Sequence, residues 1–403
     1  METELRELRD SNEFLNILLD NINSAVMIAD ENLRIFRVNR SFLGLFDGTA
    51  DQTVGKTYGQ AMGCIHTHRE GRACGETSHC ETCLVRNSLI KAAMENIPAD
   101  RVRIEKTFII NGRQQIKIFE FTTRRIHYQD RNMILMMFYD ITEIERQRLE
   151  LIAKQRQLDS DLEAAAGIQR SLLPVRLPKL AHFDFAWCFE PCKSIGGDIF
   201  NVMFLSETRV AVFMIDVCGH GVSAALVAVA VSQFFQNRNP FIANRMGVIP
   251  PDQVLNRLNR TFPFSRFDTF FTIVYLVINL TEASVEYSCA GHPPPILLRQ
   301  DGDMTPLAAK GPVIGSDVAI SYPREKIWLN PGEKLILYTD GILENQDAEG
   351  RLFGQKRFQE ALAQRSSEGI QRMVDGVYQA AKQFSLDKGF EDDVSLLGIA
   401  YNP

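Results

Sequence analysis

The sequence has no long apolar run and no apolar leader. Its longest uninterrupted apolar stretch, residues 224–231, is eight residues long, whereas a helix that spans a bilayer needs about 20. The first residues, METELRELRDSNEF, are charged and lack the apolar core of a signal peptide. These two absences predict a cytoplasmic protein without a membrane span.

An excess of positive charge is also missing. The 403 residues include 44 Lys plus Arg against 50 Asp plus Glu, which gives a net charge of −6. We therefore expect no nucleic-acid partner, because such a partner requires a basic surface. Internal repeats and low-complexity tracts are absent as well, and the balance of 45% hydrophobic and 23% charged residues is average for globular proteins. The length predicts about two or three domains.

The first 143 residues predict a sensor-type domain. Apolar residues spaced by three and four indicate an N-terminal helix within residues 1–22. Two strands around a turn at residues 30–32 follow, then a helical middle, then a three-stranded meander whose first turn is Asn111-Gly112, a strong hairpin signal. This order resembles a PAS domain over residues 12–143, which implies an antiparallel sheet.

Residues 141–172 are rich in charge and nearly free of Gly and Pro, which predicts a long helix. A seven-residue frame gives one apolar seam line, whereas half of the second line is polar. The apolar line consists of Ile144, Leu151, Leu158, Ala165 and Leu172. We expect residues 144–172 to be a coiled-coil linker that pairs weakly in a homodimer and transmits movement between domains. An ordinary solvated linker helix is the alternative.

The remainder, residues 173–403, alternates strands with a few helices. Seven apolar runs bounded by Gly, Asp or Pro are typical of strands, and helical spacing occurs around residues 224–235, 355–364 and 370–384. Strands in pairs with helices set apart predict an α+β sandwich and not a doubly wound parallel sheet.

Four aspartates recur at or beside the end of an apolar strand, usually next to glycine. They are Asp198 in SIGGDIF, Asp216 in FMIDVCGHG, Asp340 in LYTDGILE and Asp392 in FEDDVSLL. A strand end holds a carboxylate rigidly, and a neighbouring Gly lets a metal ion or phosphate approach the backbone. Mg²⁺ and Mn²⁺ favour such oxygen ligands, and two ions about 4 Å apart can activate water for phosphoryl transfer. Taken singly, each Asp is more often a turn former.

Order and flanking residues make a family recognisable. The segments IQRSLLP, SIGGDIF, DVCGHGVSAAL, AGHPPPILL, LILYTDGILE and EDDVSLL resemble, in this order, the SpoIIE/RsbU-type branch of the metal-dependent (PPM, type 2C-like) serine/threonine protein phosphatases. The resemblance implies an αββα sandwich that holds two Mn²⁺ or Mg²⁺ ions. Asp216 would bridge the ions, Asp198 and the carbonyl of Val217 would hold one of them, and Asp340 and Asp392 would complete the other. Asp393 is the alternative to Asp392.

The family also implies a reaction. Water activated by the two ions would attack the phosphorus of phosphoserine or phosphothreonine in line, with no covalent phosphoenzyme. Asp216, Asp198 and Asp340 would be the catalytic aspartates, and a phosphorylated anti-sigma-factor antagonist the substrate. A catalytically inactive pseudophosphatase that only binds a partner is the alternative.

Two histidines and two departures from the family pattern qualify this reading. His220 and His292 are candidates for a general acid, but we favour a role in fixing loop conformation. Cys218 stands where this branch commonly has Ser or another small residue, and Glu391 precedes the final aspartates. The phosphate-binding arginine of type 2C phosphatases has no clear counterpart.

A cysteine cluster interrupts the PAS-like segment at residues 64–83. It contains Cys64, Cys74, Cys80 and Cys83, and the last two form a Cys-x-x-Cys pair. Cysteines of a cytoplasmic protein stay mostly reduced, and four close together suit either Zn²⁺ or an iron-sulfur cluster. Reactive thiols or a switchable disulfide are the alternative, as is haem or another small molecule, with His66, His68 or His79 as conceivable axial ligands. We expect a sensor of a redox or metal cue.

Overall fold

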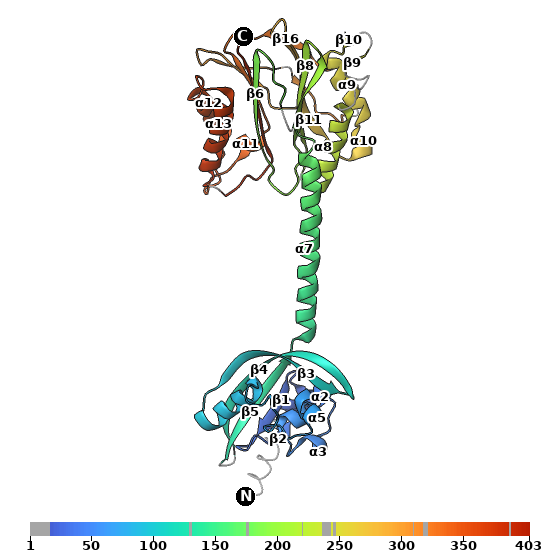
Figure 1. Ribbon diagram of the computed structural model, residues 1–403, viewed down its shortest axis with the longest axis vertical. Coiled ribbons are helices and arrows are strands. Elements are labelled where there is room, and N and C mark those ends of the chain that lie inside the picture. The colour runs from blue at the N-terminus through green and yellow to red at the C-terminus, as the bar shows by residue number, and fades with distance from the viewer. Residues whose placement is uncertain are drawn as a thin grey trace. The chain divides into compact units, whose positions relative to one another are not determined.

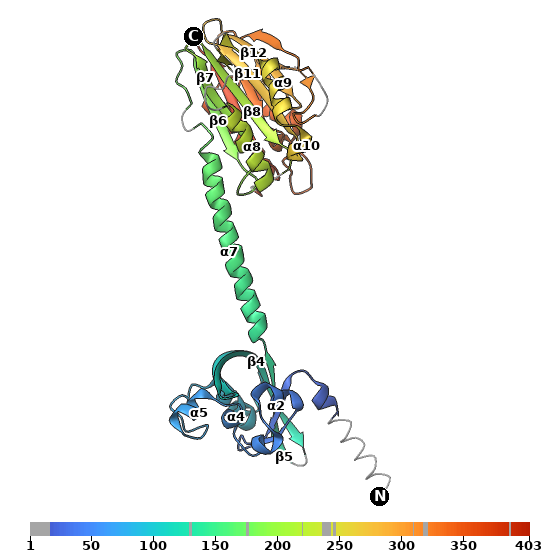
Figure 2. The ribbon, with the colours of Figure 1, turned by 90° about the vertical axis from the view of Figure 1, so that its right-hand side faces the viewer.

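The computed structural model describes residues 17–128, 131–174, 177–219, 221–235, 243–244, 247–308, 310–316, 321–386 and 388–403 (Figures 1 and 2). The chain divides into two compact units between Arg156 and Gln157. Most of the predicted N-terminal helix lies outside the described residues, and residues 17–21 are helical. In the described part of the chain, none of the helices is both long enough and apolar enough to cross a membrane.

The first unit is built on one antiparallel sheet with the strand order β2-β1-β5-β4-β3. Its strands are β1 (Ala25–Ala29), β2 (Ile35–Val38), β3 (Ala99–Ile110), β4 (Arg113–Tyr128) and β5 (Arg131–Asp140). Between β2 and β3 lie α2 (Arg40–Phe46), α3 (Ala50–Thr53), α4 (Tyr58–Ala61), α5 (Ile65–Glu70), α6 (Leu84–Ile90) and the π-helical turn η1 (Lys91–Glu95). Asn111 and Gly112 have φ values of 51° and 69°, so the predicted hairpin turn is confirmed.

Aromatic side chains fill the core of this unit. Phe46 on α2 lies within 5.7 Å of Phe108 and Phe119 between ring centroids, and Phe138 lies 5.9 Å from Phe119. The packing fixes α2 against strands β3, β4 and β5. The sequence order of two strands, a helical middle and three further strands is therefore observed, and the assignment to the PAS class stays a prediction.

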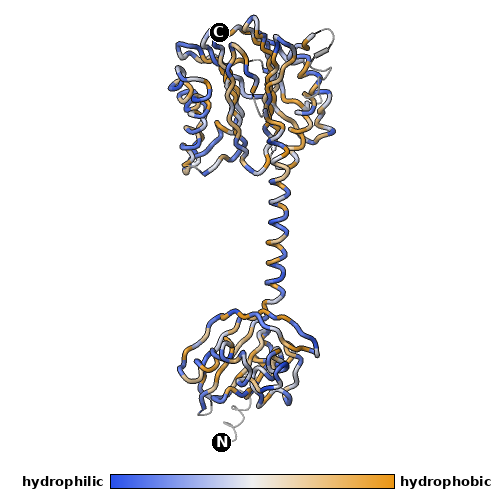
Figure 3. Tube along the Cα trace, viewed as in Figure 1, coloured by the Kyte–Doolittle hydropathy of each residue, from blue (hydrophilic) through white to orange (hydrophobic). Residues whose placement is uncertain are grey.

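A single helix, α7 (Thr142–Arg170), continues the chain from the first unit into the second. Most of it is hydrophilic in Figure 3, with short hydrophobic segments. Ile144, Leu151 and Leu158 of the predicted seam are 64%, 68% and 53% exposed. The long helix is thus observed, and its pairing with a second copy stays a prediction.

Two antiparallel-rich sheets form the second unit. The six-stranded sheet contains β7 (Ile199–Ser206), β8 (Arg209–Val217), β11 (Phe271–Asn279), β12 (Ser284–Ala290), β15 (Lys310–Gly311) and β16 (Glu325–Trp328). The five-stranded sheet contains β6 (Phe183–Glu190), β13 (Ile296–Leu298), β14 (Met304–Pro306), β17 (Lys334–Tyr338) and β18 (Val394–Tyr401). A two-stranded ribbon, β9 (Ala243–Asn244) with β10 (Gly247–Val248), is separate.

Helices cover the outer faces of the two sheets (Figure 1). The six-stranded sheet carries α8 (Val222–Phe235), α9 (Pro251–Thr261) and α10 (Phe264–Phe267), and the five-stranded sheet carries α11 (Gly341–Glu344), α12 (Gly354–Ala363) and α13 (Ile370–Phe384). Fully buried side chains from both sheets, such as Ile215, Leu337 and Leu397, share one core. The unit is therefore the expected αββα sandwich, and the predicted helices α8, α12 and α13 are confirmed within two residues at each end.

Candidate functional site

The four predicted aspartates meet where strands of the two sheets end. Asp216 is the penultimate residue of β8, and Asp198 directly precedes β7, which pairs with β8 so that Ile199 lies opposite Ile215. In the other sheet Asp340 is the N-cap residue of α11, two residues beyond the end of β17. Each sheet thus supplies carboxylates from the ends of its strands to one site.

Asp198 connects the two layers directly. Its Oδ2 accepts hydrogen bonds from Thr339 Oγ1 and Ser395 Oγ, both at 2.7 Å, and both donors belong to the five-stranded side. Asp198 is 2% exposed. Burial raises its pKa well above the ordinary range of an aspartate, and the charges of Asp216 and Asp393 raise it further, against the hydrogen bonds.

Asp216 has the surroundings of a metal ligand. Burial raises its pKa to about 7, and four carboxylates then act in the same direction. These are Asp340, Asp392, Asp393 and Glu344. Such mutual repulsion is relieved by divalent cations, and the donors are the hard oxygen ligands that Mg²⁺ and Mn²⁺ bind. The residues therefore fit the two ions that the sequence predicts.

Asp392 and Asp393 have different environments. Asp393 is 4% exposed, and its two oxygens accept backbone N–H groups of Cys192 at 2.9 Å and Gly197 at 2.5 Å. The carboxylate of Asp392 accepts the N–H of Asp393 at 2.8 Å, and its charge acts on Asp216. The backbone donors of Cys192 and Gly197 make Asp393 the residue that anchors the loop before β7, and the thiol of Cys192 lies within 4.8 Å of both carboxylates. The assignment of Asp392 as the ligand stays a prediction.

The paired glycines of SIGGDIF are required by close packing. A Cβ added at Gly197 would lie 2.7 Å from the carbonyl oxygen of Val217, and one at Gly196 would collide with the carboxylate of Asp393. Gly341 likewise leaves no room for a side chain beside the backbone of Asp393. The glycines therefore bring the carbonyl of Val217 and the carboxylates into one site.

Comparison with known proteins identifies this region. Residues 206–402 match the family model of stage II sporulation protein E (SpoIIE), and the match includes Asp216, Asp340 and Asp392. These residues are a SpoIIE-type domain. Asp198 lies eight residues before the matched segment, and its place in the site comes from the structure.

The relatives agree with the expected SpoIIE/RsbU branch. Phosphoserine phosphatase RsbU of Bacillus subtilis is 27% identical over 273 residues, which cover 67% of this chain and 78% of RsbU. Protein IcfG of Synechocystis is 26% identical over 227 residues, covering 50% of this chain and 35% of IcfG, so the chain spans about a third of that relative. The solved SiaA-PP2C domain of Pseudomonas aeruginosa has a TM-score of 0.55 at 19% identity and covers 62% of this chain and 99% of that domain, which shows the shared fold.

Gln169, the penultimate residue of α7, belongs to this site, although its sequence position indicates only a polar residue of the linker helix. Its side-chain amide donates to the carbonyl of Gly196 at 2.6 Å and accepts the N–H of Gly196 at 3.2 Å. Leu162 and Ala166 on the same helix pack with Ile195. The end of α7 is thereby fixed to Gly196, in the glycine loop of the second unit, one residue from Gly197.

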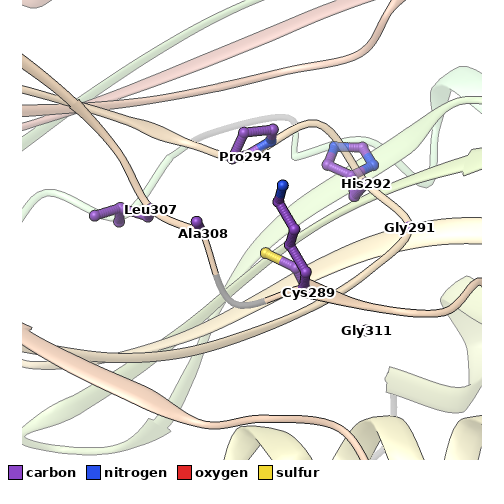
Figure 4. A pocket seen from close by; sticks show the side chains of 8 residues that line it. Cys289, Gly291, His292, Pro294, Leu307, Ala308 and Gly311 are labelled. Carbon is purple, nitrogen blue, oxygen red and sulfur yellow. The ribbon is translucent and has the colours of Figure 1, made fainter.

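His292 borders a pocket of about 260 Å³ in the SpoIIE-type domain (Figure 4). Its Nδ1 lies 2.7 Å from Thr272 Oγ1, and Thr272 pairs with Asp216 across β8 and β11. Burial lowers the pKa of His292 to about 3, so its imidazole is neutral at physiological pH. A neutral, hydrogen-bonded ring agrees with the loop-fixing role. The pocket is also lined by Cys289, Gly291, Pro294, Leu307, Ala308, Lys310 and Gly311. His220 lies outside the described residues.

Three of the four clustered cysteines lie beside α4, and the charge of the fourth, Cys80, acts on Cys74. A Cβ added at Gly59 would lie 2.7 Å from Cys74 Sγ and 3.6 Å from Cys64 Cβ. Tyr58 Oη lies 2.8 Å from Cys83 Sγ. All four thiols are free, and Cys80 and Cys83 are buried. The structure therefore brings the predicted cysteines together.

Hydrogen-bond donors stabilise two of these sulfurs as thiolates. Lys106 Nζ donates to Cys83 Sγ at 2.8 Å. The N–H of Gly75 donates to Cys80 Sγ at 3.1 Å, and Thr77 Oγ1 lies 3.0 Å from the same sulfur. Although burial raises the pKa of both thiols, these contacts hold it below the ordinary value of cysteine.

Proposed function

We propose that this protein is a metal-dependent serine/threonine protein phosphatase whose activity resides in the αββα unit. The convergence of Asp198, Asp216, Asp340 and Asp392 at one end of the sandwich carries the proposal. The raised pKa values of Asp198 and Asp216 support it, because buried carboxylates this close together require cations to ionise fully. The names of relatives such as phosphoserine phosphatase RsbU agree with this activity.

Different residues would bind the two ions. Asp198, Asp216 and the carbonyl of Val217 would hold one ion, and Asp216, Asp340 and Asp392 the other. The ions would activate water and neutralise phosphoryl oxygens. Thr339 and Ser395 occupy Oδ2 of Asp198, which leaves Oδ1 as its ligand oxygen.

A metal-dependent assay tests the activity. We expect Mn²⁺-dependent phosphate release from a phosphoserine peptide by the full chain, and a loss of at least about 100-fold in Asp216→Asn, since one ligand to both ions weakens. Asp303→Asn, on the exposed β13–β14 turn, is the matched control and should retain activity. A mutant as active as the wild type would refute the proposal, and binding of a phosphoprotein without hydrolysis would favour the pseudophosphatase.

For the substrate we propose a phosphorylated anti-sigma-factor antagonist, as the resemblance to the SpoIIE/RsbU branch implies. The identity of that protein is tested by phosphate release from candidate antagonists phosphorylated on serine, compared with an unrelated phosphoserine protein. Hydrolysis of both at equal rates would contradict the proposed preference.

The first unit is proposed to be a PAS-like sensor whose cysteines hold a metal centre. A tetrahedral zinc ion bound at about 2.3 Å would draw the sulfurs to about 3.8 Å of one another. No three of the four described thiols, however, lie within 4.8 Å of one another. An iron-sulfur cluster, which also takes four thiolates, is the other centre that these cysteines suit.

Anaerobic purification tests this centre. We expect visible iron-sulfur absorbance and bound iron, both lost in Cys80→Ala with Cys83→Ala and retained in the control Cys188→Ala, which changes a cysteine of the second unit. Stoichiometric zinc would assign the site to zinc instead, and neither metal would indicate reactive thiols.

We also propose a homodimer joined along α7, because exposed Ile144, Leu151 and Leu158 repeat every seven residues. Sedimentation should show a concentration-dependent mass that falls to the monomer in Leu151→Glu with Leu158→Glu. Leu149→Glu is the control, since Leu149 is 62% exposed but lies off the seam. A wild-type chain that is monomeric at every concentration would contradict this pairing.

A further inference from the structure

Within residues 64–83, two imidazoles and a carboxylate form a group of their own beside the four thiols. His66 and Glu70 lie four residues apart on α5, so they share one face of the helix. His79 comes from the following loop, and its ring stacks on that of His66 with a centroid distance of 3.8 Å. One ligand atom from each of the three residues lies within 4.8 Å of the other two.

A serine positions two of these side chains. The backbone N–H of Ser78 donates to Glu70 Oε2 at 3.0 Å, and Ser78 Oγ donates to Glu70 Oε1 at 2.8 Å. The same hydroxyl lies 2.9 Å from His79 Nδ1. Outer hydrogen bonds of this kind orient metal-binding carboxylates and imidazoles. The loop is thereby held with His79 over His66.

We propose that His66, Glu70 and His79 form a binding site for a divalent first-row transition metal ion, such as Zn²⁺, Co²⁺ or Ni²⁺. Imidazole nitrogen suits these ions, and a carboxylate completes a three-ligand set that leaves further positions to water. The set contains no sulfur, so its preference differs from that of the four thiols. Neither the predicted phosphatase metals nor the predicted cysteine centre accounts for it.

The position of the site gives metal binding a structural consequence. An ion held by both α5 and His79 would tie the loop of residues 71–79 to the helix. His79 directly precedes Cys80, whose sulfur accepts the N–H of Gly75 in that loop. Occupancy would therefore restrain the segment that carries one thiol of the cysteine cluster.

Cobalt titration of the full chain tests the site in a Cys80→Ser, Cys83→Ser background, which removes the thiolates of the Cys-x-x-Cys pair. We expect one equivalent of Co²⁺ beyond those taken up by the proposed phosphatase site, with weak ligand-field absorption and without thiolate charge-transfer bands. His66→Ala and His79→Ala should each weaken binding at least about 100-fold, and Glu70→Gln at least about 10-fold. His68→Ala, an exposed histidine on the same helix, is the matched control and should bind as the parent does.

Binding that survives in His66→Ala or His79→Ala, or no binding at micromolar Co²⁺, would overturn the proposal and leave a surface ion pair of Glu70 with His79. Circular dichroism checks the fold of each variant. Glu70→Gln keeps the shape of its side chain, so unchanged binding in that folded variant would overturn the three-ligand site even if an alanine variant unfolded. Because phosphatase activity is not the readout, failure here would not affect the proposed phosphatase.

Discussion

Gln169 and Gly196 exchange two hydrogen bonds, from side-chain amide to backbone carbonyl at 2.6 Å and from backbone N–H to side-chain oxygen at 3.2 Å. Gln169 is 5% exposed and is the penultimate residue of α7. The next residue after Gly196 is Gly197, which donates to Asp393 and abuts the carbonyl of Val217. The linker helix is thus one residue removed from the backbone that shapes the metal centre.

Replacing Gln169 by Leu should impair that centre. It leaves both buried backbone groups of Gly196 unpaired, which costs about 1–3 kcal/mol each. We expect the Mn²⁺ concentration for half-maximal phosphatase activity to rise at least about 10-fold, measured by metal titration of activity. Gln157→Leu, at an exposed position of the same helix, is the control. Equal Mn²⁺ requirements in both variants would show that the contact does not support the site.

Gly197→Ala should abolish the metal centre by displacement. The new methyl group would lie 2.7 Å from the carbonyl oxygen of Val217, closer than carbon and oxygen can pack. We expect a loss of Mn²⁺ binding by calorimetry and destabilisation of about 1–3 kcal/mol. Gly167→Ala on α7 meets nothing within 4 Å and should instead stabilise by about 1 kcal/mol. Normal Mn²⁺ affinity in Gly197→Ala would contradict the packing argument.

The metal-free protein should lose stability as the pH rises from about 4 to about 7. Burial, and after it the neighbouring carboxylates, raise the pKa of Asp216 from 3.8 to about 7. The folded state therefore binds more protons than the unfolded state in this window, so the free energy of unfolding falls with pH. Urea denaturation in EDTA at several pH values measures the slope. Asp216→Asn should flatten the slope, and an unchanged slope would assign the effect to other groups.

Lys106→Met should make Cys83 less reactive. Burial raises the pKa of this thiol, and the hydrogen bonds from Lys106 and Tyr58 lower it to below the ordinary value. Without the ammonium group the pKa rises, so the thiolate fraction at pH 7 falls. Iodoacetamide labelling of Cys83, quantified by mass spectrometry in the metal-free chain, should slow about 3-fold or more. Lys91→Met, at an exposed position, is the control. Equal labelling rates in the two variants would show that Lys106 does not lower the pKa of Cys83.

The sequence alone could single out the four aspartates as candidate metal ligands, because each lies at a strand end beside small residues. Such a pattern is local, so it can be recognised from neighbouring residues in the sequence. Thr339, Ser395 and Gln169 could not be recognised in this way. Their side chains are common, and their roles arise from contacts with residues 27 to 197 positions away. The backbone donors that surround Asp393 likewise come from residues far away in the sequence.

The fold shows the same contrast between features with a local sequence pattern and features that depend on tertiary contacts. The Asn111-Gly112 turn and the charged linker carry strong local signals, whereas the short strands β14, β15 and β16 were not foreseen because two to four residues give no usable periodicity. His66 and Glu70 have helical spacing, but the loop that places His79 beside them is defined only by tertiary contacts, among them those of Ser78.

The hydrogen bonds from Thr339 and Ser395 to Asp198 would link ion binding to the free energy of unfolding of the whole sandwich. They cross from one layer to the other, so the proposed ion site would exist only while both layers are assembled. Ion binding would then be linked to global unfolding, and the domain would gain RT ln(1 + [Mn²⁺]/Kd) of stability, about 2.7 kcal/mol at a hundredfold excess over Kd. A chelator would lower the melting temperature of the entire αββα unit and would not merely loosen one loop.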